Sequence, residues 1–450
     1  MSLATPVWAD DLPAALPEST QVQPIDWQRF RGPVTTDARY EACVQLVRNS
    51  SKYNVAWISG TFELNSESDA YLLTGNSEHH VRPACSVIYG MATLLKTGLY
   101  DAELTGVDAN AAKQETIRLL RGVVRAHCAN SDDDSAWGVR YPAPEPATYW
   151  QSGLWAALSG MGGWMLWEDL DSDTQVQLMA MLDAEAKRFL ADDYHVPYWN
   201  GQGGDTKAEE NSWNSMLLTL LVAMRPEHPD TPRLKQRCTE LMVSSYSTER
   251  DWKGNSNVVD GRKVSEWLNG YNALAGGVVI NHDFIHPDYM VAVSMNFWGL
   301  TTQSLADAPV TEAWDFNAPL VYNTCVEKQW RSPPYDKPGG TIYLAGRPDV
   351  YYPQGTDWSR QDYTLFYLMD VYAGLYSWND QAPTWCDVRA DAMLAMQQRH
   401  ADRRMFADGE YDTYPGREQW AFWCLTDALL PQWLEKHQAL GKKQDWLTSP

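Results

Sequence analysis

The segment 204–214, Gly-Asp-Thr-Lys-Ala-Glu-Glu-Asn-Ser-Trp-Asn, places three acids, a lysine, two amides and an indole directly before the apolar run 216–224. A buried helix gains little stability from such a polar start, whereas the free amide groups of a helix N-terminus suit a polar ligand. Glu209 and Glu210 are the residue types that a glycoside hydrolase uses as an acid pair. Adjacent helical residues point about 100° apart, so we expect that these two do not face one substrate together.

The amides of the same segment are better placed to meet a ligand. Asn211 and Asn214 lie three residues apart and share one helix face, where an amide can bind a carboxylate or a hydroxyl. We expect both to face a ligand, with Glu210 and Trp213 beside them. Helix capping is the simpler interpretation, with a residue before the helix as the cap and the glutamates at the positive helix end.

A second segment, 281–289, reads Asn-His-Asp-Phe-Ile-His-Pro-Asp-Tyr and holds two of the nine histidines, His282 and His286. Two histidines four residues apart on a helix chelate zinc. Pro287 argues against a regular helix here and no third ligand is evident, so we expect no metal. A histidine that acts as general base or acid fits better. A structural histidine in a capping loop is the simpler alternative.

The third segment, 336–358, is rich in turn residues, tyrosine, arginine and aspartate, and it ends at Trp358. Loops that carry rigid aromatics and charges often bind ligands or catalyse. Arg347 can fork onto a carboxylate. Tyr351 or Tyr352 can transfer a proton once a cation lowers its pKa. A β-hairpin that covers the helix ends is the simpler alternative.

Other predicted helices also begin with polar or aromatic side chains, namely His80, Trp150 with Gln151, and Arg417. This recurrence predicts a single cleft at one end of a helical domain, with these side chains as substrate-binding residues. The sequence has no nucleophile elbow, phosphate loop, dinucleotide fingerprint or zinc-protease motif. Triad esterases, nucleotide enzymes and zinc proteases are therefore disfavoured.

The composition is that of an ordinary globular protein of 450 residues, 44% of them hydrophobic and 21% charged, with a net charge of −22. No long basic run occurs, so nucleic acid and anionic membranes are not expected partners. An acidic substrate would need a locally basic cleft. The 22 tryptophans and 23 tyrosines far exceed the 9 phenylalanines, and their flat faces with polar edges suit stacking on sugars. We therefore expect an oligo- or polysaccharide as substrate.

Targeting and redox signals are weak. No stretch is apolar over the roughly 18 residues that a membrane span needs, and residues 1–16 lack the pattern of a signal peptide. We expect a cytoplasmic protein, or a secreted or periplasmic one if the natural N-terminus is longer. Seven scattered cysteines without a CxxC pair predict reduced or buried thiols.

Residues 1–35 are rich in proline and predict an N-terminal arm, and residues 36–450 predict a single domain. Strand signals are confined to 340–344 and 349–352. Paired helices with functional loops at one end predict an all-α fold, an (α/α)6 or (α/α)7 toroid of helical hairpins with at most a small β-hairpin over the cleft. A solenoid is the alternative, weakened by the lack of a fixed repeat. Apolar residues recur at helical spacing in 84–97, 115–128, 148–168, 172–189, 210–224, 232–246, 264–276, 290–305, 362–376, 384–400 and 417–437.

Over roughly residues 70–440 the chain resembles the αα-toroid carbohydrate-active enzymes, a group of glycosidases and polysaccharide lyases. Within that group it looks most like the uronate polysaccharide lyases of the alginate and glucuronan type that lack a β-sandwich. The segments that carry the resemblance are 208–214, 281–282 and 351–358.

The resemblance implies a role for each of four residues. Asn211 would neutralise the uronate carboxylate, and His282 would assist removal of the C5 proton. Tyr352, or the neighbouring Tyr351, would donate a proton to the leaving oxygen, and Arg347 would bind the acid group. Which tyrosine matches stays open.

Such a β-elimination needs no metal or organic cofactor, because donors fixed at the developing enolate charge are usually the largest catalytic term. Two alternatives stay open. One is a non-catalytic sugar-binding protein. The other is an inverting glycoside hydrolase of the six-hairpin type, with two acids drawn from Glu210, Asp260, Glu266, Asp357 and Glu418.

Overall fold

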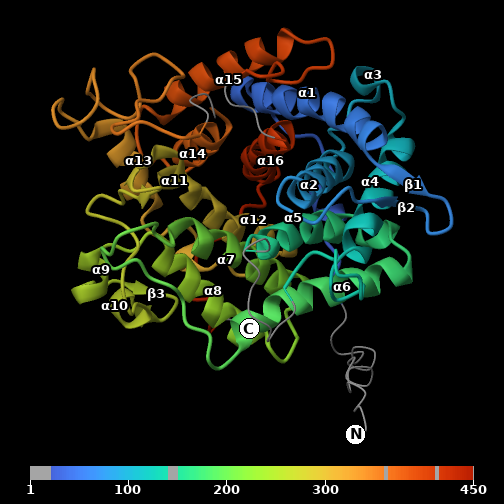
Figure 1. Cartoon of the computed structure of the whole chain (residues 1–450), viewed down its shortest axis with the longest axis horizontal. Helices are drawn as coiled ribbons and strands as arrows, with labels where there is room; N and C mark the ends of the chain where they lie inside the picture. Colours follow the sequence, from blue (N-terminus) through green and yellow to red (C-terminus); the bar gives the residue numbers. More distant parts are fainter. Residues whose placement is uncertain (1–21, 140–149, 359–362, 411–414, 449–450) are drawn as a thin grey trace, which may run out of the picture.

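The computed structural model describes residues 22–139, 150–358, 363–410 and 415–448, and it is mostly helical (Figure 1). The α-helices are α1 (Ala38–Thr61), α2 (Val81–Thr97), α3 (Ala102–Thr105), α4 (Ala109–Arg125), α5 (Ser152–Met165), α6 (Ser172–Lys187), α7 (Ala208–Met224), α8 (Thr231–Ser245), α9 (Glu249–Gly254), α10 (Val264–Trp267), α11 (Pro287–Val291), α12 (Trp298–Ala306), α13 (Ala318–Glu327), α14 (Tyr363–Leu375), α15 (Ala382–Gln398) and α16 (Arg417–Lys436). The 3-10 helices are η2 (Trp27–Phe30), η4 (Trp167–Asp169), η5 (Arg188–Leu190), η6 (Ala292–Phe297) and η7 (Glu312–Asp315). The strands are β1 (Glu63–Asn65), β2 (Ala70–Leu72), β3 (Val258–Val259), β4 (Arg262–Lys263), β5 (Ile280–Asn281) and β6 (Phe284–Ile285).

The helices that line the middle of the molecule are buried on nearly all sides. Every residue of α5 is buried, as its run of tryptophan, glycine, alanine and leucine predicts, because a helix that is apolar all round belongs in a core. Its glycines allow close packing. A Cβ at Gly162 would lie 2.9 Å from the Ile88 carbonyl oxygen of α2, so α2 and α5 approach backbone to backbone.

The contacts between helices follow a definite order. α2 packs on α5, α5 on α7, and α7 on α12 and η6. η6 packs on α14, α14 on α16, and α16 on α2 again. The helices α1, α4, α6, α8 and α15 pack on the outer sides of these, and Figure 1 shows them towards the rim.

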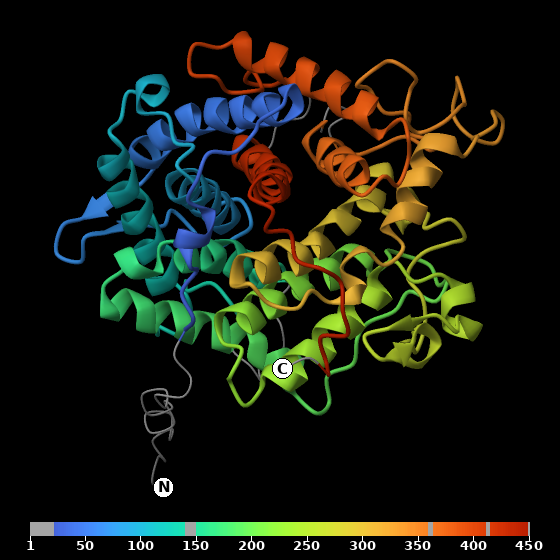
Figure 2. The ribbon, with the colours of Figure 1, turned by 180° about the vertical axis from the view of Figure 1, so that it is seen from behind.

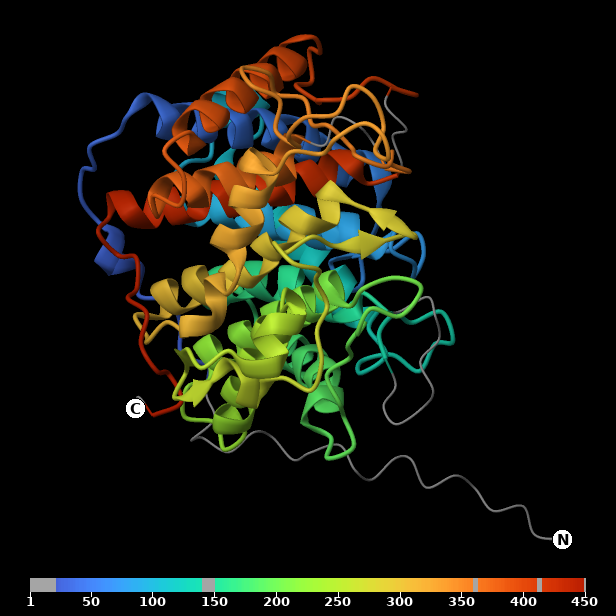
Figure 3. The same ribbon diagram turned by 90° about the vertical axis from the view of Figure 1, so that its left-hand side faces the viewer.

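The two ends of the described chain cross one face of the helical body, which Figure 2 shows from behind. The segment before α1 packs Trp27 and Phe30 against Trp433 of α16. The segment after α16 forms a bridge between Lys443 and Val310. Figure 3 shows that the hairpin β5–β6 and the long connection from α13 to residue 358 lie at the opposite end from this C-terminal segment. The polar loops therefore gather at one end of the body.

Several sequence predictions need correction. The helix predicted over 264–276 ends at Trp267, because the backbone turns to an extended conformation at Leu268, with φ −107° and ψ 135°. The strands predicted over 340–344 and 349–352 reduce to isolated bridges, one between Tyr343 and Val350 and one between Gly340 and Trp330. The long helix α1, absent from the predicted set, shows only a weak amphipathic pattern.

Other predictions agree with the structure. None of the seven cysteines, all of which lie in the described residues, forms a disulfide, and every one except Cys128 is buried. Within the described residues, the strands form two-stranded antiparallel pairs. No helix in the described part of the chain is both long enough and apolar enough to cross a membrane.

Candidate functional site

His282 stands on the turn of the β5–β6 hairpin. It and Asp283 have φ values of 50° and 66°, as a tight two-residue hairpin turn requires. Such positive φ is costly for residues other than glycine, and the cost often marks a functional site. The turn is held from two sides, because the His282 amide donates to Asp205 at 2.6 Å and the Ile285 amide donates to Gln354 at 2.7 Å.

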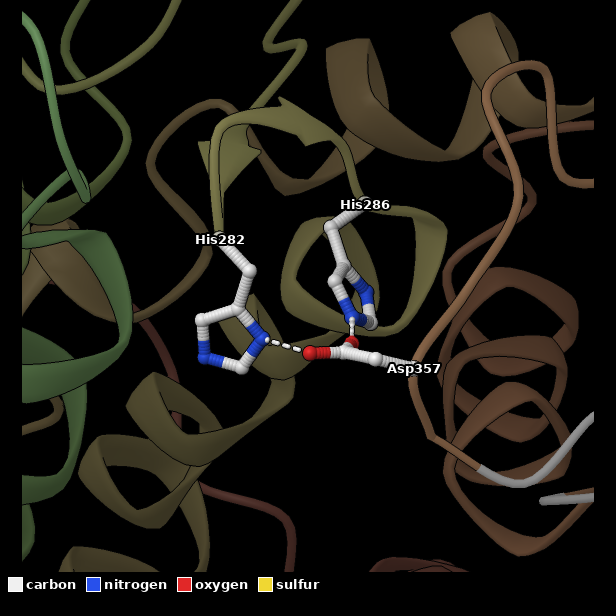
Figure 4. Close-up of side chains that lie close together, drawn as sticks. All are labelled: His282, His286 and Asp357. Carbon is white, nitrogen blue, oxygen red and sulfur yellow. Dashed lines mark hydrogen bonds and ion pairs between the residues drawn. The ribbon is translucent and has the colours of Figure 1, made fainter.

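Asp357 joins His282 to His286 (Figure 4). Its Oδ2 lies 2.6 Å from His282 Nδ1 and its Oδ1 lies 3.3 Å from His286 Nε2. His286 precedes α11, is fully buried, and has its Nδ1 at 3.3 Å from Asp288 Oδ2. Burial alone would raise the pKa of Asp357, but the neighbouring His282 and His286 outweigh it and hold the pKa below its usual range.

Tyr289 completes the arrangement on the other side of the imidazole. Its phenol oxygen lies 3.4 Å from His282 Nε2, and the Tyr246 hydroxyl fixes its backbone by donating to the Tyr289 carbonyl at 2.5 Å. Burial, followed by the charges of Glu209 and Asp205, raises the Tyr289 pKa well above its ordinary value. Asp357, His282 and Tyr289 thus form a continuous acid–base chain.

A cavity of about 260 Å³ opens beside this chain. Glu209 lines it with an exposed fraction of 6% and forms no hydrogen bond through its carboxyl group to any described residue. Burial and the neighbouring Glu210 raise the Glu209 pKa to about 8, so this carboxyl is largely protonated at neutral pH. The cavity is lined by Trp150, Asp205, Thr206, Glu209, Glu210, Asn281, His282 and Tyr289.

We expected that Glu209 and Glu210, as adjacent helical residues, would not face one ligand together, and this expectation is not met. Glu209 and Glu210 both line the cavity, because they stand in the first turn, where the cavity wraps around the helix end. Asn211 is fully buried and donates to the Pro197 carbonyl and to Ser244 Oγ, at 3.1 and 3.0 Å. Asn214 accepts a hydrogen bond from Arg188 at 3.3 Å. The two amides therefore tie α7 to its neighbours and do not line the cavity.

Of the remaining residues of that region, some line the cavity and others pack behind the lining residues. Glu210 receives a hydrogen bond from Lys207 at 3.2 Å. Trp213 is buried and packs at 4.7 Å from the ring of Trp150. Trp150 is 36% exposed and lines the cavity, so it offers an aromatic face to a ligand.

The long loop contributes Trp358 and Asp357 to the site, and its other predicted residues lie in supporting positions. Tyr352 is buried and donates to Asp288 Oδ1 at 3.1 Å, so it acts behind His286. Tyr351 donates to a backbone carbonyl, that of Asp336, at 2.6 Å. Arg347 is exposed and paired with Asp349 at 2.6 Å. Neither Tyr352 nor Arg347 lines this cavity, and their catalytic roles stay predictions.

A second cavity of about 490 Å³ holds two other predicted residues, His80 and Arg417. His80 bonds Ser77 through Nδ1 at 2.8 Å, and the Arg417 guanidinium lies over the ring of Phe406. Glu418 lines the same cavity, and its pKa is raised to about 7, chiefly by burial.

Aromatic and polar contacts connect the two cavities. Trp358 packs on Tyr289 at 4.7 Å and on Trp420 at 6.5 Å, next to the Gln419 that lines the second cavity. Arg82 covers the Trp420 ring at 5.0 Å and donates to Gln151 at 2.9 Å. The helix starts predicted to gather at one end therefore do share a neighbourhood.

Of the other acids considered for hydrolysis, two lie outside this neighbourhood. Asp260 is buried and accepts hydrogen bonds from Thr239 and Thr311, and Glu266 pairs with Lys263 at the surface.

Sequence reasoning considered Glu209 as half of an acid pair but not as a site residue, and it missed Asp205 and Tyr289, all of which line the cavity. Tyr289 is the last residue of the segment 281–289 that holds both histidines, and this proximity in sequence could have identified it as a site residue. Sequence comparisons with protein-family models and with curated proteins find no match for this chain.

Proposed function

We propose that this protein is a carbohydrate-active enzyme that cleaves a uronic-acid-containing polysaccharide by β-elimination. The observation that carries the proposal is the pair of proton-transfer groups, His282 Nε2 and the Tyr289 phenol, 3.4 Å apart and both lining one cavity. Asp357 lies 2.6 Å from the far nitrogen of His282 and orients the imidazole.

The reaction needs two proton transfers on neighbouring carbons of the sugar. The C5–H bond breaks, the C4=C5 double bond forms, and the C4–O bond breaks as the leaving oxygen gains a proton. One member of the His282–Tyr289 pair takes the C5 proton and the other supplies the proton to the leaving oxygen. Because C4 and C5 are bonded to each other, a single pair of groups at hydrogen-bond separation serves both transfers.

The surrounding side chains suit a sugar. Trp150 presents a partly exposed ring beside the carboxyl groups of Glu209 and Glu210, and aromatic faces pack against the apolar faces of pyranose rings. Glu209, protonated near neutral pH, can donate a hydrogen bond to a substrate oxygen.

We further propose that the helices form an (α/α)6 toroid. In support, the contacts run from α2 through α5, α7, α12 with η6, and α14 to α16, and then return to α2. Most of these inner helices have an outer helix packed on them. Loops at one end of such a ring would place the site in a groove long enough for a polymer.

A glycoside hydrolase is the second candidate, and Glu209 favours it. A buried carboxyl with a pKa near 8 is the form in which a general acid is held ready at neutral pH. Asp205 and Glu210 line the same cavity and offer a second carboxylate as the base.

The test is a panel of uronate polymers, alginate, glucuronan, hyaluronan and pectin, together with neutral glucans. Both ultraviolet absorbance and reducing ends are followed. Elimination creates a conjugated double bond and raises both signals, whereas hydrolysis raises reducing ends alone. New reducing ends without ultraviolet absorbance would reject the lyase in favour of the hydrolase. Binding of a polymer without either signal would indicate a sugar-binding protein.

A further inference from the structure

The cavity lining is rich in acidic residues, which disfavours a negatively charged uronate substrate. Three carboxyl groups line it, those of Asp205, Glu209 and Glu210, and Asp357 lies directly behind His282. No lysine or arginine is among the described residues that line it. Asn211 and Arg347 were expected to neutralise the uronate. Asn211 is buried behind the cavity lining, and Arg347 is paired with Asp349. Glu209 is largely neutral and Glu210 is paired with Lys207 at 3.2 Å, but the Asp205 carboxylate lines the cavity and no cation among the described residues does. A bound cation would therefore favour a negatively charged sugar here.

His282, His286 and Asp357 form a cluster with the composition of a metal site. Each offers one ligand atom, and the three atoms lie within 4.8 Å of one another. The sequence offered only the two histidines, and the fold supplies the third ligand from a loop 71 residues after His286. Figure 4 shows both imidazoles turned towards the same carboxylate.

A carboxylate already lies behind one of the two histidines of this cluster. His286 is fully buried, and its Nδ1 lies 3.3 Å from the carboxylate of Asp288. Tyr352 holds Asp288 by donating to its other oxygen at 3.1 Å. A carboxylate behind the outer nitrogen of a metal-bound histidine fixes the ring and increases its basicity. His286 Nδ1 and Asp288 Oδ2 lie at ion-pair distance without a hydrogen bond in this structure, and Nε2 of His286 lies on the side of Asp357.

The spacing fits a first-row divalent ion. Metal–nitrogen and metal–oxygen bonds of about 2.0–2.2 Å place neighbouring ligand atoms roughly 3–3.5 Å apart. The His286–Asp357 distance of 3.3 Å already matches, and the 2.6 Å between His282 and Asp357 needs a small outward movement of the half-exposed Asp357 side chain. Two imidazoles and one carboxylate leave open coordination positions, as catalytic sites do.

We propose that His282 Nδ1, His286 Nε2 and the Asp357 carboxylate bind one divalent transition-metal ion, and that this ion neutralises the carboxylate of the uronate substrate. The second part rests on the proposed elimination reaction. Ligation through Nδ1 leaves the proton of His282 on Nε2, so the imidazole then donates to the Tyr289 oxygen.

The test is metal binding by the full chain after treatment with a chelator. Zn²⁺ and Mn²⁺ are titrated by calorimetry, and bound metal is counted after desalting. Wild type is expected to take up one ion. Asp357→Asn and His282→Gln, both at partly exposed side chains, should bind at least tenfold more weakly. Asp288→Asn should lose about 10–100-fold, as second-shell changes do.

His228→Gln is the matched control, because His228 faces Asp230 at 3.9 Å as an isolated histidine–aspartate pair. This variant should bind as wild type does, and circular dichroism shows whether each variant folds. Equal uptake by wild type, Asp357→Asn and His282→Gln would overturn the site, as would the absence of any saturable uptake by folded wild type.

The experiments can reject the proposed reaction and the proposed metal site independently of each other. Elimination by protein that binds no ion would overturn the metal site and leave the lyase standing. Uptake of one ion, lost in Asp357→Asn, by a protein that cleaves no uronate polymer would keep the site and overturn its role with the uronate. Elimination that stops on chelation and returns with Zn²⁺ or Mn²⁺ would support both parts.

Discussion

Replacing Glu209 with glutamine should remove a large part of the pH dependence of stability. The pKa of this carboxyl rises from 4.5 to about 8 on folding, because the group is buried and lies beside Glu210. Its contribution to stability is therefore fully present below about pH 4.5 and is lost progressively as pH rises towards 8. At about 1.36 kcal/mol per pH unit, the loss amounts to about 5 kcal/mol. The side chain is only 6% exposed, so solvent screening reduces this little.

Glu209→Gln keeps the size of the side chain and carries no charge at any pH. Urea unfolding of wild type and variant, followed from pH 4.5 to 9, gives the midpoint at each pH. The wild-type free energy of unfolding should fall by about 5 kcal/mol more than that of the variant over this range. Glu266→Gln, at a surface glutamate paired with Lys263, is the control and should follow wild type. Parallel curves for wild type and Glu209→Gln would refute the assignment of a neutral carboxyl at this position.

The same variant separates the two candidate reactions. A hydrolase that uses Glu209 as general acid should lose about 10²–10⁴-fold in kcat, because an amide cannot supply the proton. A lyase that uses Glu209 only as a neutral hydrogen-bond donor should stay within about tenfold, because glutamine also donates.

Three further outcomes follow from the structure. Tyr289→Phe should lower kcat on the cleaved polymer by about 10²–10⁴-fold, while Tyr352→Phe, behind His286, should cost less than Tyr289→Phe; equal losses would contradict the assignment of Tyr289. Trp150→Ala should raise KM with kcat unchanged, as expected for binding that is equal in ground and transition states, and steady-state kinetics would show a fall in kcat if that is wrong. Asp370→Asn leaves the fully buried Arg389 without its ion-pair partner and should destabilise the fold by about 3–5 kcal/mol in urea unfolding, with activity per folded molecule unchanged.

The helices were predictable because their signals are local. The predicted starts and ends of α6, α8, α14, α15 and α16 lie within about two residues of those found, which is the usual uncertainty of helix ends. The helix predicted over 264–276 failed after its first turn, since the backbone is already extended at Leu268. Apolar content alone did not distinguish a buried loop from a helix there.

The site was less predictable, because it depends on which segments the fold brings together. His282 and Asp357 are 75 positions apart and share a hydrogen bond of 2.6 Å, and no spacing rule connects them. For Asn211, the helical spacing correctly predicted which residues of α7 share a face. It did not predict which face of α7 contacts α8 and which face contacts the cavity. The residue turned out to bond Ser244 in α8. A sequence pattern predicts which residues share a helix face, and the packing of the fold decides what each face contacts.

The charge of the site decides between the two reactions more sharply than its catalytic groups do. A neutral sugar can enter a cavity lined by Asp205, Glu209 and Glu210 without penalty, and a protonated Glu209 then serves it as an acid. A uronate brings a further negative charge into a partly desolvated space, in a chain whose net charge is already −22, and two like charges at about 4 Å repel by about 4 kcal/mol near a protein surface. Such repulsion cancels the binding that a few hydrogen bonds provide. A cation at the site would offset this repulsion for a uronate, and the cluster of His282, His286 and Asp357 is where the described residues offer it ligands.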